Sequence, residues 1–266
     1  MEKFYLSTKK STQVRAKKHL GQHFLNDENI AFNIVKAFTD KCETPDILEI
    51  GPGMGVLTKY LLENKTFNTW AIELDKESIP YLNIKFPQLE NRLIEADFLA
   101  LNFNDYFKNR FSLIGNFPYN ISSQIVFTLI DKRDKIPLMV GMFQKEVAER
   151  LGANPRTKDY GILSVITQAY FDVEYLFTVD EHVFIPPPKV KSGVVRLTRK
   201  TTDLNCDPKK FKQVVKLAFN QRRKKLSNAI SSLVSDKSLI VNYADKRAEE
   251  LSVEDFVNLT HILLGK

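Results

Sequence analysis

The four residues Asn116-Phe117-Pro118-Tyr119 offer the most specific chemistry in this sequence. The exocyclic amine of adenine is a poor nucleophile because its lone pair is delocalised into the ring. The side-chain carbonyl of Asn116 and the backbone carbonyl of Phe117 could accept its two N–H groups, which would favour a pyramidal amine whose lone pair points at a methyl donor. Pro118 would fix the turn that aims the carbonyl inward, and Tyr119 offers a ring on which an extruded base could stack. Such a reaction needs positioning and charge placement rather than a strong general base.

The alternative explanation of this tetrad is a turn that simply ends a strand, because Asn and Pro are both typical turn residues. A glycine-rich loop upstream favours the chemical interpretation. A short apolar run at 47–50 leads into Gly51-Pro52-Gly53-Met54-Gly55. Glycines at alternating positions let the backbone turn sharply and pass close to a ligand. A phosphate-binding P-loop is excluded, because no Gly-Lys-Ser or Gly-Lys-Thr follows.

Two acids follow this loop at the ends of later expected strands. Glu73 stands 22 residues after Gly51, and Asp97 ends the third strand. Ligands of open α/β sheets bind at the carboxyl ends of the strands, where Glu73 could accept hydrogen bonds from both ribose hydroxyls of an adenosine and Asp97 would lie near the adenine. Glu49, just before the loop, would repel a pyrophosphate and could instead face a cationic methionine end. The pattern therefore favours S-adenosylmethionine (AdoMet) over a dinucleotide.

Alternating strands and helices would bring these residues to one edge of a sheet, and the hydrophobic pattern predicts that alternation. We expect strands near 47–50, 69–72, 93–94, 111–115, 138–142 and 193–198. We expect helices at 56–63, 79–86, 122–130 and 145–151, after a first helix that Asn26 or Asp27 caps and that runs to about Phe38. The fold class is therefore α/β, a doubly wound, Rossmann-like parallel sheet covered by helices on both faces.

After about residue 200 the pattern changes to helices alone. Asp207 followed by Pro208 is a helix start signal, and Ser252 with Asp255 resembles a capping box for the last helix. We therefore expect two domains. An AdoMet-binding domain spans 1–200 and begins with a basic arm at 1–18, and a small basic helical domain spans 201–266.

The chain of 266 residues carries a net charge of +7 that is unevenly distributed. Residues 1–30 and 186–266 have net charges of +3 and +9, whereas residues 31–185 have −5. Basic ends around a mildly acidic centre favour RNA or DNA as a partner. The run Arg222-Arg223-Lys224-Lys225 spans one helical turn and is predicted to contact phosphates. A solvated surface is the alternative for any single basic run.

What the sequence lacks excludes several classes of function. It has no signal peptide and no run of about 20 apolar residues such as a membrane helix needs, which predicts a soluble, cytoplasmic protein. Its four histidines show no paired metal spacing, so we expect no metal. Cys42 and Cys206 lie outside every motif, so neither a disulfide framework nor a nucleophilic cysteine is expected.

These motifs resemble a known family along nearly the whole chain, the small-subunit ribosomal RNA adenine dimethyltransferases (the KsgA/Dim family). The related methyltransferases of large-subunit RNA share the tetrad, but the segment Phe219–Lys224 is more similar to the small-subunit branch. The matching segments are Leu20–Leu25, Glu49–Gly53, Glu73–Asp75, Ala96-Asp97, Gly115–Ser122, Gln144–Leu151, Tyr160–Ser164, Phe184–Val190 and Phe219–Lys224.

The resemblance implies an activity and a set of contacts. The activity is AdoMet-dependent transfer of two methyl groups to each of two adjacent adenosines, in a hairpin loop near the 3′ end of the RNA, on an immature ribosomal subunit whose assembly it would check. Phe184 would be a second stacking aromatic opposite Tyr119, although it could also be an ordinary core phenylalanine. The family usually has Asn where this sequence has His23, and frequently Leu where it has Phe117. By position, the AdoMet contacts fall on His23, Leu25, Gly51, Gly53, Glu73, Asp97 and Asn116.

Two other functions remain open at this point. An adenine-DNA methyltransferase would use a similar tetrad, but the sequence shows no DNA-reading module. A binding factor that docks on a ribosomal precursor would need no catalysis, whereas the complete tetrad and the acids Glu73 and Asp97 favour an enzyme. We expect a monomer, because RNA contacts need no second subunit.

Overall fold

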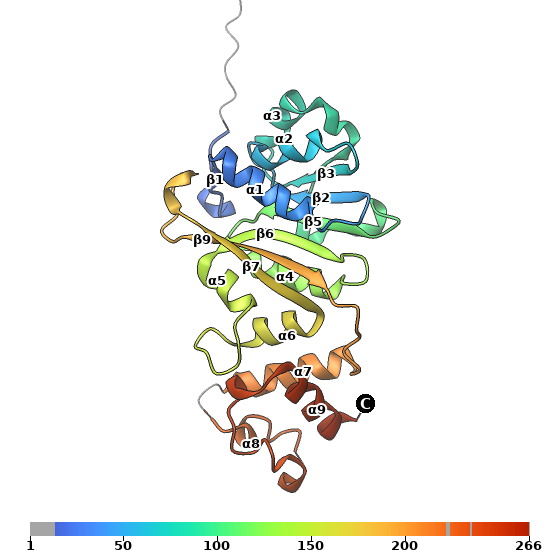
Figure 1. Cartoon of the computed structure of the whole chain (residues 1–266), viewed down its shortest axis with the longest axis vertical. Helices are drawn as coiled ribbons and strands as arrows, with labels where there is room; N and C mark the ends of the chain where they lie inside the picture. The colour runs from blue at the N-terminus through green and yellow to red at the C-terminus, as the bar shows by residue number, and fades with distance from the viewer. Residues whose placement is uncertain (1–13, 222–223, 235, 266) are drawn as a thin grey trace, which may run out of the picture.

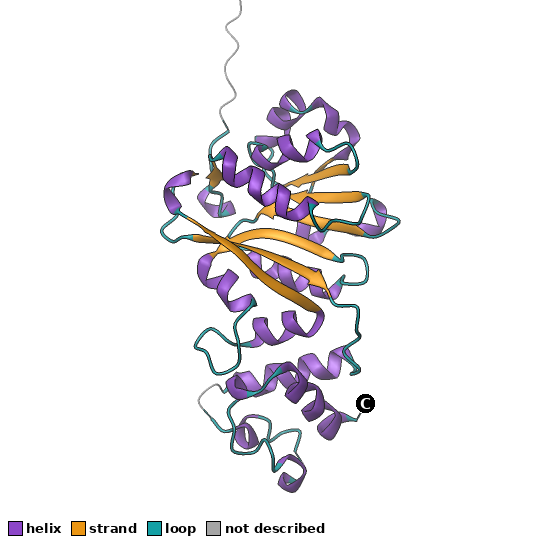
Figure 2. Cartoon of the chain, viewed as in Figure 1, coloured by secondary structure: helices purple, strands orange, loops and turns teal. Residues whose placement is uncertain are grey.

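The computed structural model describes residues 14–221, 224–234 and 236–265. A seven-stranded sheet lies at its centre, with helices on both faces and further helices beyond one side (Figures 1 and 2). The strands follow the order β4-β3-β2-β5-β6-β9-β7. Their bounds are β2 (Asp46–Ile50), β3 (Asn68–Glu73), β4 (Leu93–Glu95), β5 (Phe111–Asn116), β6 (Leu138–Gln144), β7 (Phe171–Val179) and β9 (Ser192–Arg199).

Five neighbouring strands, from β4 to β6, are parallel, as the alternating pattern predicts. The other two differ from a purely parallel sheet, since β9 runs antiparallel to both β6 and β7. The chain order reverses at β2, which has β3 on one side and β5 on the other. Loops that follow β2 and β5 diverge there, and this is where ligands of such sheets bind.

Most predicted elements are confirmed to within a residue or two. Asp27 caps the first helix by accepting a hydrogen bond from Ile30 N at 3.0 Å. The helices that cover the sheet are α1 (Glu28–Thr39), α2 (Val56–Glu63), α3 (Ser78–Lys85), α4 (Ser122–Asp131), α5 (Lys145–Leu151) and α6 (Ile162–Tyr170). The sequence analysis missed α6 and β7 altogether.

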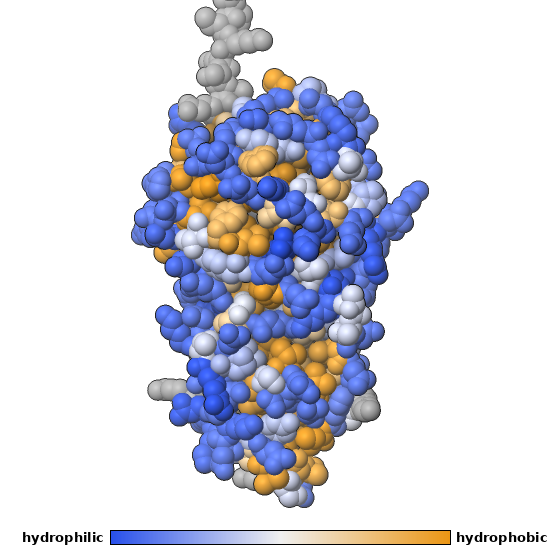
Figure 3. All heavy atoms as spheres, in the orientation of Figure 1, coloured by the Kyte–Doolittle hydropathy of each residue, from blue (hydrophilic) through white to orange (hydrophobic). Residues whose placement is uncertain are grey.

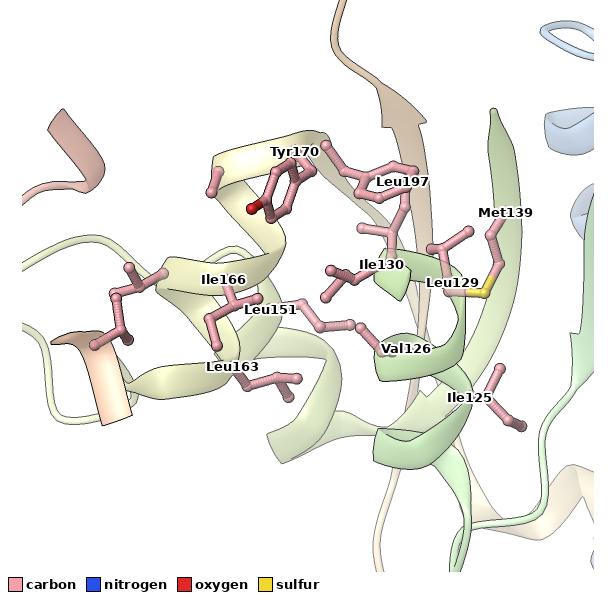
Figure 4. Close-up of a cluster of buried hydrophobic side chains, with 14 of the residues drawn as sticks. Ile125, Val126, Leu129, Ile130, Met139, Leu151, Leu163, Ile166, Tyr170 and Leu197 are labelled. Atoms are coloured by element: carbon pink, nitrogen blue, oxygen red, sulfur yellow. The ribbon is translucent and has the colours of Figure 1, made fainter. Parts of the chain in front are cut away.

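Each face of the sheet has its own apolar layer. Leu25, Ile34 and Phe38 pack with Val140 on one face. On the other face α4 supplies Ile125, Val126, Leu129 and Ile130, α5 supplies Leu151, and α6 supplies Leu163, Ile166 and Tyr170, which lie over Met139 of β6 and Leu197 of β9 (Figure 4). Hydrophilic side chains cover much of the visible outer surface, with apolar patches between them (Figure 3).

The chain after β9 is helical, with α7 (Pro208–Asn220), α8 (Leu226–Ala229) and α9 (Val253–Leu264). Both predicted start signals are confirmed, because Asp207 accepts from Lys209 N and Lys210 N, and Ser252 and Asp255 form a reciprocal capping box. Phe211 of α7 and Phe256 of α9 belong to the same apolar cluster as α6. The two-domain division at 200/201 stays a prediction.

Candidate active site

A cleft opens at the carboxyl ends of β2, β3 and β5. Residues 20–24 form its opposite wall. The space inside it, counted together with the solvent at its open side, is about 850 Å³. It brings together most of the site residues predicted from the sequence, namely His23, Gly51, Gly53, Glu73, Asp97, Asn116, Phe117, Pro118 and Tyr119.

The glycine loop takes a backbone shape that other residues adopt only with strain. Gly51, Gly53 and Gly55 have φ of 65°, 54° and 76°, in the left-handed region where a Cβ is unfavourable. At Gly53 an added Cβ would lie 2.8 Å from the Phe24 ring, so the loop and the opposite wall of the cleft are in close contact.

Glu73, at the end of β3, holds this loop in place. Its carboxylate accepts hydrogen bonds from Gly53 N at 3.1 Å, Leu74 N at 3.0 Å and Asp75 N at 2.9 Å. Burial raises the pKa of Glu73, and the backbone donors oppose that rise. A carboxylate offers about four acceptor positions. Backbone donors use three of them, and the bonds from Glu73 to both ribose hydroxyls stay a prediction.

Glu49 lies elsewhere than expected. It is 1% exposed and does not line the cleft, so it does not face a bound methionine end as predicted. Its carboxyl accepts a hydrogen bond from Thr58 Oγ1 at 2.6 Å. Burial raises its pKa to about 8, which makes it a neutral acid at physiological pH. A neutral Glu49 would repel a pyrophosphate only weakly. Glu73, unlike Glu49, lines the cleft.

Asp97 marks the far end of the cleft. Its Oδ1 accepts from Leu99 N at 2.9 Å and caps a short 3₁₀-helix, Phe98–Ala100, which leaves the other carboxylate oxygen available. Leu74 and Leu99 line the cleft beside it and are 50% and 37% exposed. Both leucines therefore offer apolar surface in the cleft against which an aromatic ring could pack. The sequence analysis missed them, although each lies within two residues of a predicted acid.

The tetrad after β5 is oriented by the opposite wall. Asn116 Nδ2 donates to the His23 carbonyl at 2.9 Å, which leaves Asn116 Oδ1 as an acceptor in the cleft. Phe117 N donates to Met142 O at 3.2 Å, whereas no donor among the described residues reaches the Phe117 carbonyl. The Phe117 ring is buried against Gly115 and Gly141, where an added Cβ would come within 2.7 and 2.1 Å of it. Two free acceptors thus stand on consecutive residues.

Tyr119 is half-buried and fixed at both its ring and its hydroxyl. The hydroxyl lies 2.6 Å from Oγ of the buried Ser192, the first residue of β9. The His23 ring stands 5.3 Å from the Tyr119 ring, tilted by 30°. His23 Nδ1 lies 2.8 Å from the Pro186 carbonyl, which can only accept, so Nδ1 is the donor of this hydrogen bond. His23 and Ser192 therefore hold the ring that was predicted to stack on a base.

The segment before β1 (Phe24–Leu25) is anchored rather than free. Lys17 Nζ forms an ion pair with Asp75 Oδ1 at 2.5 Å and a second with Glu77 at 3.2 Å. Burial alone would raise the pKa of Asp75, but the Lys17 hydrogen bond and charge bring it below its usual value. The predicted arm at 1–18 is thus fixed to the end of β3 at Lys17, and residues 1–13 lie outside the described part.

Four predicted residues are not brought into the cleft. Leu25 and Phe184 pair across the two-stranded sheet of β1 and β8 (Phe184–Ile185) and are buried together, with 4% and 1% exposed. Phe184 is a core side chain here, and its stacking role stays a prediction.

Lys224 and Lys225 lie exposed beyond α7, where Lys225 pairs with Asp245 at 2.7 Å. The remaining two of that basic run, Arg222 and Arg223, are outside the described residues.

Comparison with known proteins identifies the family. The model of the ribosomal RNA adenine dimethylase family matches residues 13–264. The chain belongs to this family. It is 56% identical to ribosomal RNA small subunit methyltransferase A of Cytophaga hutchinsonii, over 96% of this chain and 99% of the relative. The Flavobacterium johnsoniae protein of the same name is 57% identical over 93% of this chain and 95% of the relative.

Two solved methyltransferase structures have the same overall fold as this chain. A dimethyladenosine transferase from Plasmodium falciparum matches with a TM-score of 0.77 at 26% identity, over 89% of this chain and 96% of that chain. The 23S rRNA methyltransferase ErmE matches with a TM-score of 0.70 at 25% identity, over 90% and 99%. The chain is accordingly an rRNA adenine dimethyltransferase whose methyl donor is AdoMet.

Neither a metal-binding cluster nor a membrane-spanning helix occurs among the described residues. No group of three or more His, Cys, Asp or Glu side chains there could hold a metal ion. No helix in that part of the chain is long and apolar enough to cross a membrane.

Proposed function

We propose that this chain dimethylates two adjacent adenosines in a 3′-terminal hairpin loop of small-subunit rRNA, on an immature ribosomal subunit. The observation that carries the proposal is the pair of free acceptors, Asn116 Oδ1 and the Phe117 carbonyl, in a cleft that also holds two carboxylates and a glycine loop. The names of the relatives support a small-subunit substrate. We expect the enzyme to act as a monomer in the cytoplasm.

The residues that would hold AdoMet fit its parts. The remaining acceptor position of Glu73 suits a ribose hydroxyl, and the available oxygen of Asp97 suits the amino group of the adenine. Leu74 and Leu99, which line the cleft, offer apolar surface for the adenine ring. Gly51, Gly53 and the 20–24 segment would flank the methionine part. When bound, AdoMet supplies a methyl group on a sulfonium cation, a strong electrophile.

The tetrad would prepare the adenosine amine for attack. Asn116 Oδ1 and the Phe117 carbonyl would each accept one N–H, so that the nitrogen lone pair turns out of the ring plane. Nitrogen forms a bond to the methyl carbon as the bond from carbon to sulfur breaks, and the proton lost afterwards goes to an acceptor or to water. A monomethylated amine still has one N–H to donate, which suits a second transfer at the same place. The rate advantage would come from positioning.

The test is a product analysis across substrates. The protein and AdoMet would be incubated with under-methylated small ribosomal subunits, with large subunits and with duplex DNA, and methylated nucleosides would be quantified by mass spectrometry after digestion. The proposal expects dimethyladenosine at two adjacent positions in small-subunit RNA alone. Dimethyladenosine in large-subunit RNA, or methyladenine in DNA, would overturn the substrate assignment. Binding to the small subunit with no methylated product would make this a binding factor.

A further inference from the structure

Two glycines stand side by side in the middle of the central sheet, where glycine is an unfavourable residue. Gly115 of β5 and Gly141 of β6 are direct partners in the parallel pairing of these strands, and both are buried. A glycine inside a strand weakens it, because glycine has no side chain to pack and loses more freedom on folding than other residues. Such a residue often marks a place where another group approaches the backbone closely.

The group that approaches these glycines is the ring of Phe117. A Cβ added at Gly141 would lie 2.1 Å from Cε2 of this ring, and the next nearest atoms, Cδ2 and Cζ at 2.8 Å, belong to the same ring. A Cβ added at Gly115 would lie 2.7 Å from Cε1 of the ring and 2.6 Å from the Ile50 carbonyl oxygen. The ring, 1% exposed, therefore occupies space that two side chains would otherwise fill. We call this space, formed by Gly115 and Gly141, the glycine socket.

The socket lies on the face of the sheet that α4 covers. Phe117 belongs to the same apolar cluster as Met139, which stands two residues before Gly141 on β6 and packs against α4 (Figure 4). Successive side chains of a strand point to opposite faces, so residues 139 and 141 share this face. The ring of Phe117 thus folds back over the sheet, away from the cleft, while its backbone stays at the end of β5.

Three consecutive residues of β6 hold Phe117. Gly141 admits the ring, the Met142 carbonyl accepts a hydrogen bond from Phe117 N at 3.2 Å, and the ring of Phe143 packs edge-on with its centroid 5.2 Å away. The side chain and the N–H of Phe117 are therefore both bound to β6. Its carbonyl, which no donor among the described residues reaches, is the group proposed to accept an N–H of the target amine.

The place of the ring determines the direction of this carbonyl. The Cα of Phe117 is tetrahedral, so once its N and Cβ are held, the position of its carbonyl carbon follows. Pro118 comes next, and a residue before proline is restricted to extended conformations with a narrow range of ψ. The carbonyl oxygen therefore has little freedom of its own, and a displaced ring would turn it.

We propose that Gly141 is a positioning residue for methyl transfer, because it admits the Phe117 ring and so aims the Phe117 carbonyl at the target amine. Gly141 does not line the cleft. The three atoms nearest to its added Cβ all belong to Phe117, whereas Gly115 also adjoins the Ile50 carbonyl. The inference rests on the proposed function, since it assumes that the Phe117 carbonyl accepts a hydrogen bond from the adenosine.

Gly141→Ala tests this by placing one methyl group in the socket. The ring must move, and the carbonyl turns with it. A misplacement of about 1 Å at a reacting group can lower a rate ~10²-fold, and we expect a loss of this size in single-turnover methyl transfer to under-methylated small subunits with saturating AdoMet. AdoMet affinity, measured by calorimetry, should stay unchanged. The matched control Gly161→Ala adds the same methyl group where nothing lies within 4 Å, and it should keep the full rate.

The same substitution should have little effect once the ring is gone. Phe117→Leu keeps the backbone carbonyl and an apolar side chain, but it lacks the outer ring atoms that an alanine at position 141 would meet, and its δ carbons can turn aside. Residues in contact show non-additive effects. The double variant Phe117→Leu/Gly141→Ala should therefore transfer methyl groups about as fast as Phe117→Leu alone, and faster than Gly141→Ala alone.

Thermal unfolding identifies a temperature at which each variant is folded, and rates are compared there. Equal losses from Gly141→Ala in both backgrounds would overturn the inference. So would a Gly141→Ala protein that melts earlier but methylates at the unchanged rate, since Gly141 would then serve packing alone. If Gly141→Ala does not fold, an active double variant supports the inference, and a double variant far slower than Phe117→Leu overturns it. An unchanged protein that methylates no small subunits would instead remove the proposed function itself.

Discussion

At the scale of single residues, Asn116 illustrates how the site depends on distant parts of the chain. Its amide would be free to rotate if nothing held it, and either its oxygen or its nitrogen could face the cleft. The His23 carbonyl, 93 residues earlier, accepts from Nδ2 and so presents Oδ1 to the cleft. The tetrad and its chemistry are predictable from residue types alone. Its orientation is not, because no local pattern reports which backbone carbonyl lies opposite.

Glu49 leads to a prediction about pH. A glutamate in the unfolded chain titrates near 4.3, whereas burial raises the pKa of Glu49 in the folded protein to about 8. Between these values the folded state binds one more proton than the unfolded state. The free energy of unfolding must therefore fall as pH rises from about 5 and level off above about 8.

Glu49→Gln should remove this dependence, because glutamine keeps an acceptor for Thr58 Oγ1 and has no charge to bury. At pH 9 the ligand-free variant should be more stable than the unchanged protein by about 4 kcal/mol, because roughly three units of the pKa shift lie between pH 5 and pH 9 at ~1.4 kcal/mol for each unit. At pH 5 the two should be nearly equal. Denaturant unfolding at both pH values measures this, and equal stabilities at pH 9 would show that Glu49 is not neutral in the fold.

At the scale of elements, β9 positions the turn that follows β5. Its first residue, Ser192, is buried and hydrogen-bonds Tyr119, although β6 separates the two strands in the sheet. Ser192→Ala and Tyr119→Phe each remove this hydrogen bond but keep the aromatic ring. Each should lower the rate of methyl transfer about tenfold, which corresponds to roughly 1.4 kcal/mol, and should leave AdoMet affinity unchanged.

The double variant Ser192→Ala/Tyr119→Phe tests whether the loss of this hydrogen bond causes the slower methyl transfer. If both changes act through it, the combined variant should be no slower than either single one, since interacting residues are not additive. Single-turnover rates with saturating AdoMet give the comparison. Fully additive losses would mean that Ser192 and Tyr119 act separately.

The elements that the sequence predicts well have clear boundary signals, and the two that it misses do not. In β2 and β5 short apolar runs end at glycine or asparagine, and α1 and α7 have cap residues and one apolar face. In α6, seven of nine residues are buried, and no polar cap marks its start, because Gly161 stands at the N-cap position without a side chain. In β7, which lies at the sheet edge, a bulge between Tyr175 and Phe177 interrupts the alternation.

At the scale of the whole molecule, the acidic and basic segments of the chain occupy different parts of the fold. The acidic centre forms six of the seven strands of the central sheet and most of the cleft, and the basic C-terminal part supplies β9 and then packs as helices on the side away from β4 (Figure 1). Composition could predict this polarity, but it could not show which distant segments meet. Lys145 of α5 and Lys191 before β9 line one groove, for example, only because the folded chain brings these segments together.

Asn116 is proposed to act on the adenosine amine rather than merely to shape the pocket. Asn116→Ala removes one of the two proposed acceptors and leaves the acids that would hold AdoMet. The measurement is dimethyladenosine formed per enzyme on under-methylated small subunits, beside AdoMet affinity by calorimetry. We expect methyl transfer to fall about 10²–10³-fold, and AdoMet affinity to stay within about tenfold, the size of one lost hydrogen bond. Methyl transfer close to that of the unchanged protein would contradict it, as would a loss explained entirely by failure to bind AdoMet.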